Sequence, residues 1–124
     1  MISYIIPTLW KSKFIFETIN SFKQINDDKA ELIIIDNNQS DFTDPDPRIK
    51  VFRMKQNIFV NPAWNLGVSF STNDKVCIVN DDIKFNLPRF HKFVLETGVK
   101  AVCYNSKTYL TTKDEDEYKL IQFT

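Results

Sequence analysis

Glycine and histidine are scarce in this sequence, and their scarcity removes several kinds of functional site. The 124 residues include two glycines, Gly67 and Gly98, and one histidine, His91. A glycine-rich loop that cradles phosphates needs several glycines close together, so we expect no such loop and no nucleotidyltransferase built around one. A zinc site needs closely spaced ligands, and His91 has none at such a spacing.

Net charge and long apolar runs are also absent. Sixteen basic residues balance sixteen acidic ones, whereas proteins that bind nucleic acid show a clustered basic surface, so no nucleic-acid partner is predicted. No apolar run approaches the roughly 20 residues of a transmembrane segment, and residues 1–7 do not resemble a signal peptide. Cys77 and Cys103 lie in apolar runs, where we expect buried free thiols rather than a disulfide. A cytoplasmic protein is therefore predicted.

Apolar residues are plentiful, and they fall into short segments that predict strands. Hydrophobic residues make up 43% of the chain, enough to bury a core in a single domain. Continuous apolar runs typical of strands covered on both faces span 2–6, 31–35 and 75–79. Residues 49–53 alternate in character and predict a half-exposed edge strand, and a fifth strand is expected at 100–104.

Helices are predicted between these strands. In the first, Ser12 is the expected N-cap, and apolar residues follow at helical spacing, namely Ile15, Ile19 and Phe22. Asn61 and Pro62 predict the N-cap and first residue of the second helix. A third helix is expected to begin at Pro88 and to end at Gly98. Strands that alternate with helices predict an α/β fold with a mostly parallel sheet.

The last part of the chain differs in character from the rest. We expect a core over 1–105 and a C-terminal hairpin or tail over 106–124, all within one domain. The acidic run 114–117 is interpreted as the solvated turn of that hairpin. Residues 37–48 are rich in Asp, Asn, Ser and Pro and predict an irregular surface loop.

Polar residues follow three of the predicted strands where each one ends. They are Thr8, Asp36 and the run Asn80, Asp81 and Asp82. Parallel strands bring their carboxyl ends to one edge, where open α/β sheets bind ligands. Asp36 can accept hydrogen bonds from a base or ribose, and Asp82, with Asp81, can hold a divalent cation together with diphosphate oxygens. The alternatives are a strand-ending cap for Asp36 and a solvated turn for residues 80–82.

Four motifs in this order resemble family 2 glycosyltransferases with the GT-A fold. They are SYIIPT at 3–8, LIIIDN at 32–37, the stretch 57–67, and VNDD at 79–82. Within 57–67, Ala63, Asn65 and Gly67 match the family's Ala-x-Asn-x-Gly pattern. The turn at 80–82 is similar to the family's DXD motif, with Asn80 in place of the leading Asp.

The resemblance implies a fold, a donor and a set of site residues. The fold is a Rossmann-like three-layer sandwich, and the donor is a nucleoside-diphosphate sugar. Its pocket is implied to contain Thr8, Asp36, Asn65, Asn80 and Asp81, while Asp82 is implied to bind Mn²⁺ or Mg²⁺. Trp10 lies two residues after Thr8 in the sequence. Two roles are equally open for it, a position against the base and a role in packing. The implied activity is metal-dependent transfer of a sugar to an unknown acceptor.

The resemblance does not supply the acceptor half of the site. Members are usually longer, and their second half carries the acceptor site and the catalytic base. Apart from the metal turn, 114–117 is the remaining acidic cluster, and no residue in it is singled out as a base. The alternatives are a short or truncated enzyme, a chain completed by a partner or an oligomer, a non-catalytic nucleotide-sugar-binding module, and a structural scaffold.

Overall fold

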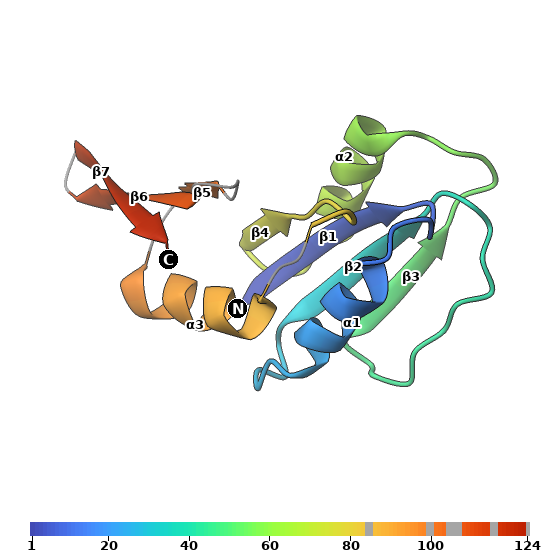
Figure 1. Ribbon diagram of the computed structural model, residues 1–124, viewed down its shortest axis with the longest axis horizontal. Coiled ribbons are helices and arrows are strands. Elements are labelled where there is room, and N and C mark those ends of the chain that lie inside the picture. The colour runs from blue at the N-terminus through green and yellow to red at the C-terminus, as the bar shows by residue number, and fades with distance from the viewer. Residues whose placement is uncertain (84–85, 99–100, 104–107, 115–116, 124) are drawn as a thin grey trace. The chain divides into compact units, whose positions relative to one another are not determined.

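The computed structural model describes residues 1–83, 86–98, 101–103, 108–114 and 117–123, and describes side chains for 1–83 and 86–98. The chain divides into two compact units, Met1–Pro88 and Arg89–Thr124. The elements follow in the order β1 (Ile2–Thr8), α1 (Ile15–Lys23), β2 (Glu31–Asp36), β3 (Ile49–Arg53), α2 (Val60–Phe70), β4 (Lys75–Ile78), α3 (Leu87–Thr97), β5 (Ala101–Cys103), β6 (Thr108–Asp114) and β7 (Glu117–Phe123) (Figure 1).

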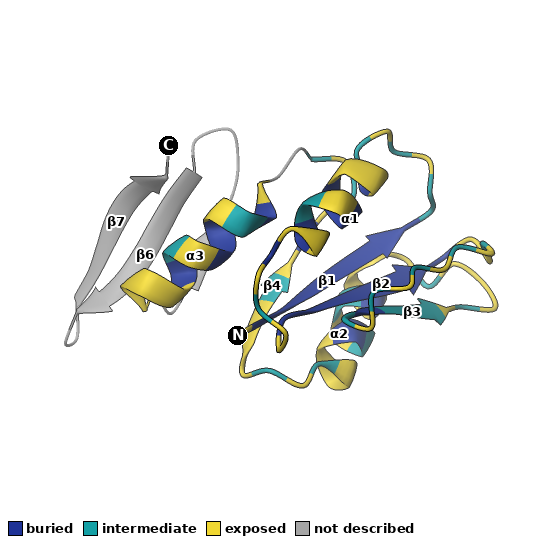
Figure 2. Cartoon of the chain, turned by 90° about the horizontal axis from the view of Figure 1, so that it is seen from below, coloured by how far each residue is buried: buried dark blue, intermediate teal, exposed yellow. Residues whose placement is uncertain are grey.

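The first unit is built on a four-stranded sheet with the order β3-β2-β1-β4. Every strand pair in this sheet is parallel. Helices α1 and α2 lie on opposite faces of the sheet, which gives three layers (Figure 2). The predicted α/β fold with a mostly parallel sheet is therefore confirmed for this unit.

The two central strands form the core. Every residue of β1 and β2 is buried, as expected for parallel strands covered on both faces. On one face α1 buries the apolar residues predicted for it, Ile15, Ile19 and Phe22. On the other face Gly67 of α2 lies so close to Ile5 that an added Cβ would overlap the Ile5 side chain. Gly67 is therefore required by packing.

The outer strands differ from each other and, in one case, from the prediction. β3 is half-exposed, as predicted for an edge strand. β4 was predicted to be buried, but three of its four residues are exposed and Ile78 retains 51% of its accessible surface. The physical reason is its position, because among the described residues β4 pairs with β1 alone.

Two helix starts also differ from the prediction. Ser12 is not the N-cap of α1: its hydroxyl accepts a hydrogen bond from the backbone N–H of Phe14 at 3.1 Å, and Phe14, two residues later, is the N-cap. Asn61 lies inside α2, whose N-cap is Phe59. Pro62 is tolerated there because the first turn of a helix needs no N–H partner.

The third helix follows the prediction more closely. α3 begins at Leu87, one residue before Pro88. Gly98 ends it with φ +64°, and its N–H donates to the carbonyl of Val94 at 3.1 Å. This is the left-handed residue that commonly ends a helix.

The second unit contains a three-stranded sheet with the order β5-β6-β7. Both strand pairs are antiparallel, and Asp114 lies opposite Glu117 at the end of the β6–β7 ladder. Residues 115 and 116 of the acidic run lie outside the described residues. No helix in the described part of the chain is long and apolar enough to cross a membrane.

Candidate functional site

The carboxyl edge of the four-stranded sheet brings together residues that are far apart in the sequence. Thr8, Asp36 and Arg53 end three neighbouring strands and lie in register. The backbone N–H of Asn37 donates to the carbonyl of Thr8 at 3.0 Å, so the pairing continues beyond β2. Open parallel sheets bind ligands at this edge, and for that reason the sequence predicts a ligand site here.

Thr8 joins the end of β1 to the acidic turn. Its hydroxyl donates to Oδ2 of Asp81 at 2.7 Å and accepts a hydrogen bond from the backbone N–H of Trp10 at 2.9 Å. Thr8 is buried, whereas Asp81 is half-buried. A side chain 73 residues earlier in the chain therefore fixes the position of the acidic turn.

Asp36 is fully buried, and both of its carboxylate oxygens are used within the chain. Oδ1 accepts from the N–H of Asn38 at 2.9 Å, and Oδ2 accepts from the N–H of Ser40 at 2.9 Å and from the Ser40 hydroxyl at 2.5 Å. Nε of Arg53 lies 3.9 Å from Oδ2. Burial raises the pKa of Asp36, but the hydrogen bonds from Ser40 and Asn38 outweigh it and hold the pKa below its usual value.

The acidic turn presents one engaged carboxylate and one free to take a ligand. Asp81 is engaged by Thr8, while Asp82 and Asn80 are exposed and form no hydrogen bond within the described residues. In that part of the chain, no three His, Cys, Asp or Glu side chains are close enough to hold a metal ion. Mg²⁺ typically takes one or two carboxylates and completes its shell with phosphate oxygens and water. The turn fits a cation held in that way.

Asn65 is the one predicted site residue that the structure does not connect to the others. It lies exposed within α2 and forms no hydrogen bond to any described residue. By contrast, Gly67 of the same motif is explained by its packing against Ile5. The placement of Asn65 in the donor pocket therefore stays a prediction.

Backbone strain gathers at the same edge. Three residues other than glycine have positive φ among those described: Trp10 at 65°, Gln39 at 49° and Phe59 at 66°. They occupy the loops that follow β1, β2 and β3, and thus all lie at the carboxyl edge. Bulky residues rarely adopt this conformation, which costs about 1–3 kcal/mol each and tends to occur at ligand sites.

An aromatic cluster lies beside Thr8 and Asp36. The ring of Trp10 packs against Phe42 at 4.8 Å and against Phe16 at 5.8 Å between centroids. The indole Nε1 of Trp10 is buried and forms no hydrogen bond within the described residues. The packing interpretation of Trp10 is thus supported, and its indole also lies near enough to Asp36 to help lower the pKa of that carboxyl.

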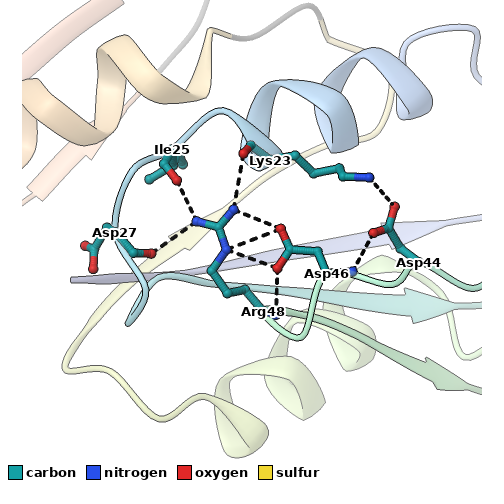
Figure 3. Close-up of polar contacts among 6 residues, drawn as sticks. All are labelled: Lys23, Ile25, Asp27, Asp44, Asp46 and Arg48. Atoms are coloured by element: carbon teal, nitrogen blue, oxygen red, sulfur yellow. Dashed lines mark hydrogen bonds and ion pairs between the residues drawn. The ribbon is translucent and has the colours of Figure 1, made fainter.

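The loop at 37–48 is held by several contacts, among them an ion pair between Lys23 and Asp44 at 3.1 Å. Beyond Asp36, the Arg53 guanidinium donates to the carbonyls of Ser40, at 2.7 Å, and Phe42. At its far end Arg48 pairs with Asp46 at 2.9 Å. Arg48 also donates to three carbonyls around the end of α1, those of Lys23, Ile25 and Asp27 (Figure 3). Sequence reasoning predicted the loop but missed Ser40, Arg48 and Arg53. No sequence pattern marks a hydroxyl that binds a carboxylate or a cation that binds backbone carbonyls.

Comparison with protein families identifies the chain. The sequence model described as "Glycosyl transferase family 2" matches residues 3–122, nearly the whole sequence. The chain belongs to glycosyltransferase family 2. The resemblance inferred from four short motifs is therefore confirmed.

Several solved structures share the fold of this family 2 chain. S. aureus TarS 1–349 superposes with a TM-score of 0.62 at 23% identity, covering 78% of this chain and 33% of TarS. The mannosyltransferase PcManGT from Pyrobaculum calidifontis, in complex with GDP-Man and Mn²⁺, gives 0.62 at 19% identity, covering 79% and 33%. S. aureus TarS 1–349 in complex with UDP-GlcNAc gives 0.57 at 23% identity, covering 78% and 32%. The GT-A fold expectation is confirmed.

The chain spans about one third of the length of these neighbours. No sequence among the curated proteins matches it. The neighbours therefore establish the fold, and the activity has to be argued from the site.

Proposed function

We propose that this chain supplies the donor-binding half of a metal-dependent glycosyltransferase that moves a sugar from a nucleoside diphosphate to an acceptor. The observation that carries the proposal is the hydrogen bond from Thr8 to Asp81, which fixes the acidic turn at the ligand-binding edge. Family membership and two neighbours solved with nucleotide sugars support the same class of donor.

Asp82 is the proposed metal ligand. It is exposed and forms no hydrogen bond within the described residues, so its carboxylate can bind Mn²⁺ or Mg²⁺ without breaking an existing contact. A cation bound there together with the diphosphate would stabilise the negative charge on the departing nucleoside diphosphate. Asp81 is its proposed diphosphate-side neighbour and Asn80 its proposed ribose-side neighbour, and Thr8 holds Asp81 in position.

The nucleoside is proposed to lie toward β2. Asp36 ends that strand, and its carboxylate shapes the loop that carries Asn38 and Ser40. A direct bond from Asp36 to a base would require the exchange of a hydrogen bond it already accepts. Asn65 is kept as a second donor contact, and the acceptor and catalytic base lie outside this proposal.

Calorimetric titration of UDP and GDP, with and without Mn²⁺, tests the assignment. The variant is Asp82→Asn, which removes the charge and keeps the size. We expect binding that needs Mn²⁺ in the wild type and affinity lowered about tenfold or more in the variant, since even groups that only support metal ligands cost that much.

The matched control is Asp74→Asn. Asp74 is also exposed but precedes β4, at the opposite edge of the sheet. Asp74→Asn makes the same chemical change as Asp82→Asn. The affinity of this variant for UDP and GDP should stay within twofold of the wild type. Equal losses in both variants would indicate a general charge effect and contradict the site. Binding without detectable transfer to any acceptor would favour the non-catalytic module.

A further inference from the structure

Phe59 combines two unfavourable features at the carboxyl edge. Its backbone has φ 66° and ψ −179°, a region that essentially only glycine occupies. Its side chain is 71% exposed, the most exposed of the large apolar residues described. Glycine at this position would remove both the strain and the exposed ring, so neither backbone geometry nor packing in this structure accounts for phenylalanine.

The backbone around Phe59 is fixed on both sides. Its N–H donates to Oδ1 of Asn57 at 2.8 Å, and its carbonyl accepts the first helical hydrogen bond of α2, from Ala63 at 3.2 Å. The preceding N–H, that of Ile58, donates to Oδ1 of Asn37 at 3.2 Å. These bonds hold the strained conformation, so the ring projects from a defined point.

The position of this loop indicates which part of a nucleotide the ring would meet. Asn37 directly follows β2, whereas Asp81 and Asp82 follow β4, and β1 lies between those strands. A nucleotide whose diphosphate lies at the acidic turn would extend its nucleoside toward β2 and the β3–α2 loop. Aromatic rings bind bases by stacking, with little dependence on which base is present.

We propose that Phe59 is a ligand-contacting residue whose ring stacks against the nucleoside of the donor. The inference rests on the proposed donor site and adds a residue that neither the family motifs nor the hydrogen-bonding pattern assigns. Strain at a ligand site persists when the surrounding structure enforces it and function uses it. Here the strain at Phe59 destabilises the free protein, and it holds the aromatic ring ready for the ligand.

The test is to replace Phe59 by glycine and to measure both stability and binding. We expect Phe59→Gly to raise the midpoint of thermal unfolding by about 3–5 °C, because relief of strain exceeds the added chain entropy of glycine. The affinity for UDP and for GDP in the presence of Mn²⁺ should fall about tenfold, a typical stacking contribution. A residue with a purely structural role would not move stability and affinity in opposite directions.

Two further variants act as controls. Phe59→Tyr keeps an aromatic ring and should keep the affinity for both nucleotides within threefold. Val68→Gly removes an exposed apolar side chain, 43% accessible, near the other end of α2. Its glycine enters an ordinary helical position, so the unfolding midpoint should fall and the affinity should stay unchanged.

Each remaining outcome decides the question. A lower midpoint for Phe59→Gly would show that the ring packs within the fold, and an unchanged UDP affinity would remove it from the site; either result overturns the inference. Loss confined to UDP-GlcNAc, with UDP unaffected, would move the ring to the sugar and overturn the nucleoside assignment. If the wild type binds no nucleotide, the proposed function fails first and this inference fails with it.

Discussion

The two edges of the parallel sheet each hold one buried carboxylate, and the partners of the two carboxylates come from different distances along the chain. At the amino edge, Glu31 accepts hydrogen bonds from Ser3 at 2.7 Å and from the N–H of Thr72 at 2.6 Å, and pairs with Lys50 at 2.5 Å. These partners lie 19 to 41 residues away in sequence. At the carboxyl edge, Asp36 is bonded mainly to Asn38 and Ser40, within four residues.

The difference separates stability from function within one sheet. Glu31 connects β1, β3 and the segment before β4, so its contacts form only when the whole sheet has formed. Asp36 shapes the loop that follows it, and the strained residues and the acidic turn lie at the same edge. We infer that the amino edge contributes mainly to global stability, while the carboxyl edge sets the geometry of the ligand site.

The largest expected effect is therefore at Glu31. Glu31→Ala leaves the Thr72 N–H and the Ser3 hydroxyl without their acceptor, and we expect a loss of about 3 kcal/mol in the free energy of unfolding. Nucleotide affinity, measured where the variant is still folded, should stay within twofold. Urea unfolding and calorimetric titration supply the two measurements. A tenfold loss of affinity would mean that the two edges are coupled.

Glu17→Ala is the matched control for this change. Glu17 is exposed in the first turn of α1. It contributes through the helix dipole alone, about 0.5 kcal/mol. A similar loss in both variants would contradict the special role of Glu31.

At Asp36 we expect a smaller loss of stability than at Glu31 and a larger loss of nucleotide affinity. Asp36→Asn weakens the charge-assisted bonds to Asn38 and Ser40, which should cost about 1–2 kcal/mol. Because the partners are local, amide exchange should accelerate mainly in residues 38–42, and UDP affinity should fall. Asp41→Asn, an exposed change in the same loop, should alter neither. Exchange that accelerates evenly across the sheet would show that Asp36 acts globally, as Glu31 does.

The sequence was sufficient for most of the fold because its signals are local. Continuous apolar runs marked β1 and β2, and Gly98 marked the end of α3. The errors arose where tertiary contacts override local preference. Ser12 bonds within a turn instead of capping α1, and the residues of β4 have the composition of a buried strand but lie at an exposed edge of the sheet.

For the candidate site, the sequence placed Thr8, Asp36 and Asp81 at the carboxyl edge, where the structure has them, but it did not reveal their contacts. Thr8 and Asp81 were each predicted, and their hydrogen bond joins positions 73 residues apart, which no spacing rule reveals. Asp36 was predicted either as a base contact or as a cap at the end of its strand, and the structure shows its carboxylate capping the turn that follows β2. The sequence alone does not distinguish a buried from an exposed ring at Phe59, because the distinction depends on its backbone angle and its exposure.

The smallest expected effect is a difference in pH dependence, and it tests whether Glu31 acts through its charge. Burial raises the pKa of Glu31, but hydrogen bonds from Lys50, Ser3 and Thr72 outweigh it, and the net pKa is lowered. In the unfolded chain a Glu side chain titrates near about 4.3. Between the two pKa values the unfolded state binds more protons than the folded state, so stability rises with pH in that window.

The stabilisation by the Glu31 charge is thus complete above about pH 5 and is lost as the pH falls through the unfolded and then the folded pKa. Glu31→Gln lacks this titration, so its deficit relative to the wild type should be largest at pH 7 and should narrow toward pH 3. Urea unfolding of both proteins at pH 7, 5, 4 and 3 measures the difference. A deficit that stays constant across this range would show that Glu31 stabilises the amino edge through neutral hydrogen bonds and packing, and the contrast between the two edges would then rest on connectivity alone.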